Sequence, residues 1–130
     1  MAGFSDYLED KVLDHVFGGV AYTAPTTHYV ALYTVAPTDT GGGTEVTGGA
    51  YARQTSTFTV SGTSPTTATN AAAIEYPTAT ADYGTVVAVG ILDALSGGNL
   101  LAYANLDTSK VVSNGDVFRF DAGDLDITLA

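Results

Sequence analysis

The residues best suited to chemistry are three aspartates near the C-terminal end of the sequence. Asp121, Asp124 and Asp126 would bring several carboxylates together, and carboxylate oxygens are the ligands that Ca²⁺ prefers. The run Asp121-Ala122-Gly123-Asp124 nevertheless lacks the spacing of a calcium-binding loop. Aspartate and glycine also favour turns, because the aspartate side chain bonds to nearby backbone amides. We therefore predict a turn here and no bound metal, with calcium as the open alternative.

The residue types used in catalysis occur without the partners that catalysis requires. His15 and His28 are separated in the sequence and the chain has no cysteine, so a zinc site is not expected. No serine lies in the motif that exposes a hydrolase nucleophile. The glycine-rich stretches lack the lysine that follows a phosphate-binding loop. We therefore predict that the protein is not an enzyme and holds no cofactor.

The chain is strongly acidic, with 14 acidic residues, 4 basic residues and a net charge of −10. Binding to nucleic acid draws on clustered lysine and arginine, and anionic membrane surfaces attract the same residues. We therefore expect neither nucleic acid nor a membrane among the partners. Charged residues make up only 14% of the chain, compared with about 25% in typical soluble domains. Much of the surface must then consist of threonine, alanine and tyrosine.

The elements that would position these residues begin with one helix, predicted over residues 4–17. Ser5 is a suitable N-cap, because its hydroxyl can accept a bond from a free amide in the first turn, and Gly18-Gly19 favours a helix end. An apolar stripe recurs at Phe4, Leu8, Val12 and Val16. The stripe fits either a helix that docks on a partner or a lid packed on its own sheet, and we predict attachment to a partner subunit.

From His28 onward the apolar residues alternate with a period of two, which indicates strands. The predicted strands are His28–Val35, Tyr51–Val60, Ala71–Tyr76, Thr85–Leu92, Leu100–Leu106, Lys110–Ser113, Asp116–Phe120 and Leu125–Leu129. Thr85–Leu92 is the most apolar and should lie at the sheet centre, whereas Ser61–Asn70 should be a loop. We predict one mainly β domain over residues 1–130. Its architecture would be an antiparallel β-sandwich of about eight strands, jelly-roll or Greek-key like, with one short N-terminal α-helix; a small barrel also fits the pattern.

The tyrosines are the most suitable interface residues outside the helix. Tyrosine is enriched at protein interfaces because it buries area while keeping a polar tip, although strand propensity alone also explains its presence. The residues predicted for an interface are Phe4, Leu8, Val12, Val16, Tyr29, Tyr33 and Tyr103. Faces of threonine, alanine and tyrosine cost little to desolvate, so we predict a homo-oligomer, with a trimer as the expected state.

The sequence resembles a family of small tailed-bacteriophage virion proteins that are commonly labelled phage tail fibre or virion-associated proteins. The resemblance runs over nearly the whole chain and is carried by Tyr7–Lys11, Leu13–Gly18, Tyr22–Pro25, Tyr29–Thr34, Pro37–Asp39, Gly41–Val46, Tyr51–Gln54, Asn114–Asp116 and Ala122–Leu125. It implies a structural protein of the virion, assembled in the host cytoplasm, whose partners are other virion proteins.

Within that class the expected role is a tail-associated fibre or adaptor. The chain length also suits a capsid decoration (cement) protein on the head surface, and a receptor- or carbohydrate-binding module is the third possibility. The resemblance brings no catalytic residues with it.

Overall fold

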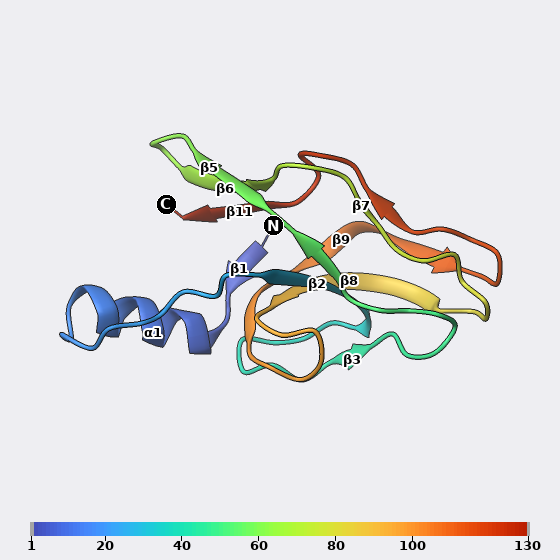
Figure 1. The fold of residues 1–130 in the computed structure, drawn as a ribbon, viewed down its shortest axis with the longest axis horizontal. Helices are drawn as coiled ribbons and strands as arrows, with labels where there is room; N and C mark the ends of the chain where they lie inside the picture. The colour runs from blue at the N-terminus through green and yellow to red at the C-terminus, as the bar shows by residue number, and fades with distance from the viewer. Residues whose placement is uncertain (1, 130) are drawn as a thin grey trace.

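The computed structural model describes residues 2–129, which form one large, mostly antiparallel sheet, one small antiparallel sheet and one helix (Figure 1). The elements are β1 (Ala2–Phe4), α1 (Asp6–Val16), β2 (His28–Val35), β3 (Thr44–Glu45), β4 (Gln54–Ser56), β5 (Phe58–Ser61), β6 (Thr66–Asn70), β7 (Ile74–Glu75), β8 (Gly84–Leu92), β9 (Leu100–Val112), β10 (Arg119–Phe120) and β11 (Asp126–Leu129). The mainly β fold with a short N-terminal helix is thus confirmed, with more and shorter strands than the eight predicted.

The larger sheet has the order β3-β2-β8-β9-β1-β11-β6-β5, and β4 also pairs with β2. The predicted central strand is confirmed, since β8 lies between β2 and β9 and is buried from Ala88 to Leu92. β8 and β9 form a hairpin around Gly97-Gly98. All pairings in this sheet are antiparallel except that of β1 with β11, where Ala2 lies beside Ile127.

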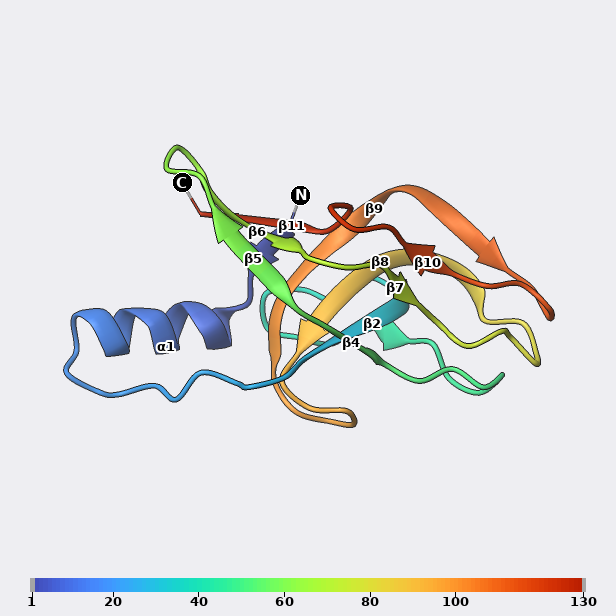
Figure 2. The same ribbon diagram turned by 45° about the horizontal axis from the view of Figure 1, so that its top comes forward.

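One segment joins the two ends of the large sheet. The predicted strand Tyr51–Val60 is split at Thr57 into β4, which pairs with β2, and β5, which pairs with β6. Because these partners lie near opposite ends of the strand order, the sheet curls back on itself in a sandwich-like arrangement (Figure 2). β7 and β10 form the small sheet, which adds the buried side chains of Ile74 and Phe120 to the core.

The main core fills the space between the layers and is rich in aromatic rings. Tyr51 stacks on Tyr76 at 6.0 Å between ring centroids, and Phe118 meets Phe120 edge to face at 5.0 Å. The buried hydroxyl of Tyr76 donates to the carbonyl of Val30 at 2.7 Å, which satisfies a polar group that would otherwise be costly to bury. Tyr51 and Tyr76 are thus core residues, and the bond from Tyr76 also ties the segment after β7 to β2.

Two predictions for the middle of the chain were wrong. Ser61–Asn70 is not all loop, because β6 pairs with both β5 and β11; its threonines have strand propensity that its serine and glycine neighbours concealed. Leu100–Leu106 and Lys110–Ser113 are not separate strands but parts of the continuous β9. A bulge there sets Asn105 opposite Ala88 and Lys110 opposite Val86, which absorbs the extra residues.

Three other boundaries also differ from the prediction. Ala71–Tyr76 and Asp116–Phe120 shrink to β7 and β10, which pair with each other. The predicted helix over 4–17 begins at Asp6, because Phe4 belongs to β1 and pairs with Ala102 of β9. Ser5 is nevertheless the N-cap, as predicted, and accepts a bond from the Leu8 amide at 3.2 Å.

The buried side chain of Asn70 ties the end of β6 to the loop before β11. Its amide donates to the carbonyls of Ala72 and Asp121, both at 2.9 Å. Its oxygen accepts from the amides of Gly123 at 3.1 Å and Leu125 at 2.9 Å. The side chain of Asn70 thus bonds to four backbone groups, three of which belong to residues 121–125.

We expect Asn70→Ala to lower the free energy of unfolding by roughly 3 kcal/mol, because it leaves buried donors and acceptors unsatisfied. Urea denaturation followed by tyrosine fluorescence measures this. Asn105→Ala, at an exposed position of β9, is the matched control and should change stability by about 0.5 kcal/mol or less. Equal effects of the two substitutions would contradict the role assigned to Asn70.

Candidate functional site

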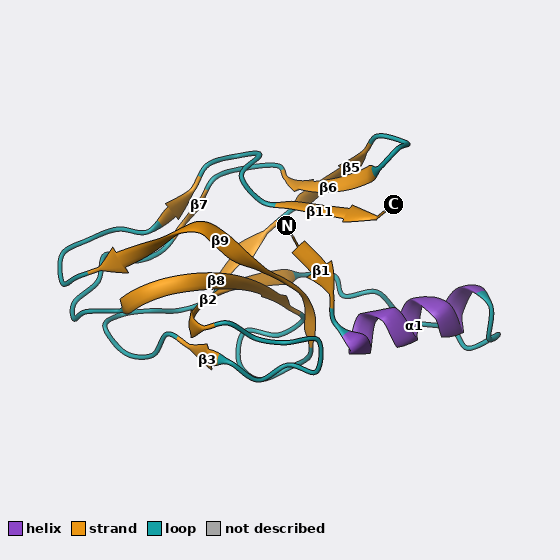
Figure 3. Cartoon of the chain, turned by 180° about the vertical axis from the view of Figure 1, so that it is seen from behind, coloured by secondary structure: helices purple, strands orange, loops and turns teal. Residues whose placement is uncertain are grey.

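Helix α1 and the segment that returns from it form an arm, residues 6–27, that projects from the β domain (Figure 3). The base of the arm is fixed. The Ser5 amide donates to the carbonyl of Leu101 at 2.8 Å, its hydroxyl donates to the carbonyl of Leu100, and the Asp6 amide donates to the carbonyl of Asp39 at 2.9 Å. Tyr7 and Leu8 pack against the main core. The arm therefore leaves the sheet in a defined direction.

Beyond its first turns the arm has little protein around it. No residue of α1 is buried, so the helix is not a lid over the sheet. The returning segment lies along one side, where the Tyr22 amide donates to Nδ1 of His15 at 3.1 Å and the rings of Tyr7 and Tyr22 meet edge to face. The opposite side stays open to solvent.

The open side ends in a cluster of large apolar side chains that we call the arm tip. Its members are Leu13 (59% exposed), Val16 (60%), Phe17 (82%) and Val20 (55%). Contiguous apolar patches on a soluble protein mark sites of interaction. The arm tip is therefore the main candidate functional site of the part of the chain that the structure describes.

The four residues of the predicted apolar stripe do not share one environment in the structure. Phe4 and Leu8 pack against the core and Val12 is half-buried, so only Val16 belongs to the arm tip. On a helical projection Leu13 and Phe17 lie beside the stripe. The projection alone does not show that these two residues are exposed while Phe4 and Leu8 are covered. Val20 lies after the glycines that end the helix, and helical spacing gave no signal for it.

The predicted tyrosines lie on one face of the β2–β8–β9 sheet. Pairing sets Tyr29 beside Leu92, and both Ala31 and Tyr103 beside Gly90. Tyr29 and Tyr103 are partly exposed. Tyr33 is buried instead, and its ring lies so close to Gly90 that an added Cβ there would come within 2.7 Å of it. Whether these tyrosines contact another subunit stays a prediction.

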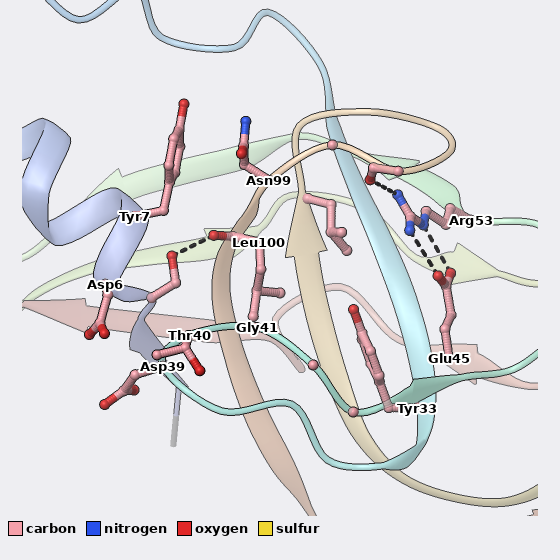
Figure 4. Close-up of a pocket in the computed structure, with 16 residues that line it drawn as sticks. Asp6, Tyr7, Tyr33, Asp39, Thr40, Gly41, Glu45, Arg53, Asn99 and Leu100 are labelled. Carbon is pink, nitrogen blue, oxygen red and sulfur yellow. Dashed lines mark hydrogen bonds and ion pairs between the residues drawn. The ribbon is translucent and has the colours of Figure 1, made fainter.

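A hollow of about 690 Å³ lies over this face, beside the base of the arm (Figure 4). Its lining comes from Ser5–Tyr7, Tyr33, the loop 39–43, Glu45, Arg53, Leu92 and the turn 97–100. The hydroxyl of Tyr103 donates to the carboxylate of Asp39 near its edge, and that bond raises the pKa of Tyr103. The phenol therefore stays protonated and holds the loop against the sheet.

Among residues 2–129, Arg53 is the only cation that lines the hollow, and its donors are already engaged. Its Nε and Nη2 donate to the two carboxylate oxygens of Glu45 at 2.9 and 2.8 Å. Its Nη1 donates to the carbonyls of Ala94 and Gly97, both at 2.8 Å. With 9% of its side chain exposed, Arg53 clamps the β8–β9 turn to β3 and is not available to hold an anion.

Glu45 also accepts a bond from the Tyr51 hydroxyl at 2.7 Å, and that hydroxyl accepts from the Leu32 amide at 3.0 Å. Burial tends to raise the pKa of Glu45, but the hydrogen bonds from Arg53 and Tyr51 and the charge of Arg53 outweigh it and hold the pKa below its ordinary value. Burial, together with the bond to Glu45, raises the pKa of Tyr51. Sequence reasoning missed this network because nothing in the spacing of Glu45 and Arg53 shows that they meet.

The C-terminal aspartates are engaged in local bonds. Asp121 accepts from Nε of Arg119 at 2.9 Å, Asp124 from the Asp121 amide at 2.8 Å, and Asp126 from the Thr69 hydroxyl at 2.8 Å. Within residues 2–129, no three acidic or histidine side chains come together in a way that could hold a metal ion. The turn at Asp121–Asp124 is as predicted. Over the same residues, no helix has the length and apolar character needed to cross a membrane.

A family model described as "Podophage GP4 fiber I protein gp80" matches residues 3–128. No curated protein matches the chain. The matched region includes the arm, the hollow and nearly all of the β domain.

The Glu45–Arg53 pair should make stability depend on pH. Because the pKa of Glu45 is lowered by folding, its ionised form stabilises the folded state fully above about pH 4.5, and this contribution is lost as the pH falls through the folded pKa. We expect Glu45→Gln to lower the free energy of unfolding by roughly 1 to 3 kcal/mol at neutral pH. The difference from wild type should narrow as the solution is acidified.

Urea denaturation at a series of pH values from neutral to acid measures this difference. Glu75→Gln is the matched control, since its ion pair with Arg119 is longer, at 3.4 Å, and exposed. A Glu45→Gln deficit that does not change with pH would contradict the role assigned to the carboxylate.

Proposed function

Since the chain belongs to the family of the podophage GP4 fiber I protein gp80, we propose that it is a tail-associated fibre or adaptor subunit that attaches to its partner through the arm. Membership of this family makes the chain a structural virion component of tailed bacteriophages. The tail position, the use of the arm and the lack of catalysis are the proposed parts. The observation that supports the use of the arm is an apolar arm tip held away from the β domain by a fixed base, while the description of the matched family supports the tail position.

A non-enzymatic role agrees with the side chains that the hollow offers. Its arginine is bound to Glu45 and to backbone carbonyls. The carboxylate of Asp39 accepts from Tyr103. These groups stabilise loops, and none of them is paired with a nucleophile. The hollow is therefore best understood as part of the scaffold that supports the base of the arm.

An attachment role accounts for the form of the arm. Helices of this length depend on tertiary or quaternary contacts for most of their stability, and α1 packs on the β domain through Tyr7 and Leu8 near its base, with no residue buried. Covering Leu13, Phe17 and Val20 with another subunit would supply the rest. Deleting residues 1–17 would also remove β1 and the buried Ser5, so substitutions at the arm tip are the sharper test.

Location in the virion tests the tail assignment. We expect gold-labelled antibody against this chain to mark the tail in electron micrographs, and quantitative mass spectrometry of virions to give the low copy number of an appendage. Label spread over the head, with a copy number matching a capsid-wide lattice, would show a capsid decoration protein instead.

Loss of the arm tip should remove the protein from the virion without unfolding it. We expect phage encoding Phe17→Ser to incorporate at least tenfold less of the chain, because a central apolar anchor contributes about 2 kcal/mol or more to an interface. Immunoblots of purified virions measure this. Val111→Ser, at a position that is 70% exposed on β9, is the control and should incorporate normally. Normal incorporation of Phe17→Ser would contradict the use of the arm.

A further inference from the structure

We propose that the arm tip binds the arm tip of a second copy of this chain. The inference rests on the proposed attachment role and names the partner. It follows from the distribution of charge along the arm, from the shape of the arm and from what surrounds it at the same end of the molecule.

The first step is the apolar character of the tip. Leu13, Val16, Phe17 and Val20 are each more than half exposed, and Phe17 has the largest exposed fraction of the large apolar residues, at 82%. Large aromatic and aliphatic side chains gathered in this way resemble the anchors at the centre of protein interfaces. The base of the arm is bonded to β9 and to Asp39, which directs the tip away from the β domain and leaves these side chains uncovered.

The second step is the absence of charge. The sequence has no acidic or basic residue between Asp14 and Asp39, so the outer end of the arm is formed by an uncharged stretch. Two copies that each carry −10 repel over most of their surfaces. The contact that costs them least is one to which each copy brings few carboxylates, and Asp14 is the only acidic residue in the stretch from Leu13 to Thr38.

The open side of α1 also limits how two arms can meet. Its first turns carry Asp6, Glu9 and Asp10, all exposed, while Leu13 and Phe17 follow at the far end. Arms laid side by side along their whole length would bring these carboxylates together. Contact between the tips keeps the acidic bases apart and buries only the apolar ends. The resulting interface uses the same patch on both copies.

A partner with basic residues is the less suitable occupant. Such a partner would gain most from the exposed carboxylates of the chain, which lie at the base of the arm and on the β domain, for example at Asp107 and Asp124. The tip offers it no ion pair beyond Asp14. The chemistry of the tip selects an uncharged apolar surface, and another arm tip is such a surface.

The neighbouring hairpin extends the same uncharged end. The sequence from Gln54 to Ile74 has no charged residue, and the β5–β6 hairpin within it points to the same end of the molecule as the arm (Figures 1 and 2). Val60 of β5 is also among the exposed large apolar residues. Two copies meeting at their arms can therefore approach without bringing charges together at this end.

Single cysteines test the contact directly, because the chain has none of its own. A disulfide forms only when two Cα atoms come within about 7 Å. We expect purified Val20→Cys to form covalent dimers at least tenfold faster than Val111→Cys under mild oxidation, since Val111 lies near the end of β9, away from the arm. Cross-linking of Val20→Cys at the rate of Val111→Cys would overturn the inference.

Sedimentation equilibrium gives a second, independent measurement. We expect the wild-type chain to self-associate and Phe17→Ser to raise the dissociation constant by about 30-fold, with Val111→Ser unchanged and circular dichroism the same in all three. A wild-type chain that stays monomeric at the highest attainable concentration would overturn the inference. If Phe17→Ser is then still lost from virions, the tip binds a different virion protein. Label on the head would overturn only the tail assignment.

Discussion

The closure of the large sheet by residues 54–61 is the constraint on which the rest of the structure depends. One short stretch of chain bonds to β2 through β4 and to β6 through β5, with only Thr57 between them. This double pairing bends the sheet until its inner faces meet around the aromatic core. Without it, β6 would be the last strand at one end of the sheet, the His28–Val30 edge of β2 would be unpaired, and Tyr51 and Tyr76 would lose part of their cover.

Closure also determines where the arm leaves the domain. β1 is held between β9 and β11, and the chain turns into α1 at the buried Ser5, whose hydroxyl both donates to the sheet and caps the helix. A single side chain thus fixes the helix to the strand beside it. The hollow next to this junction is bounded by loops that Arg53 and Tyr103 hold in place, so the base is rigid while the tip is open.

Much of the fold could be predicted from local patterns in the sequence, and what could not be predicted depends on distant pairing. The apolar alternation of β2 and β8 and the N-cap at Ser5 are local signals, and the structure confirms them. The identity of β6 was not visible, because threonine-rich strands have the composition of loops until a neighbour pairs with them. The predicted arm residues included Val16, but helical periodicity identifies a stripe without showing which part of it the sheet covers. The Glu45–Arg53 pair brings together residues that no motif connects.

The pairing of β1 with β11 has a consequence for how the protein is made. Ala2 and Ile127 lie side by side, so β1 obtains one of its two neighbours only after more than a hundred further residues have been made. Contacts between such distant parts of a chain form late and slow the completion of folding. Without β11, β1 would pair only with β9 and β6 only with β5, and one edge of each strand would be left open. The base of the arm therefore depends on two distant segments, because β1 has both of its neighbours only when β11 is in place.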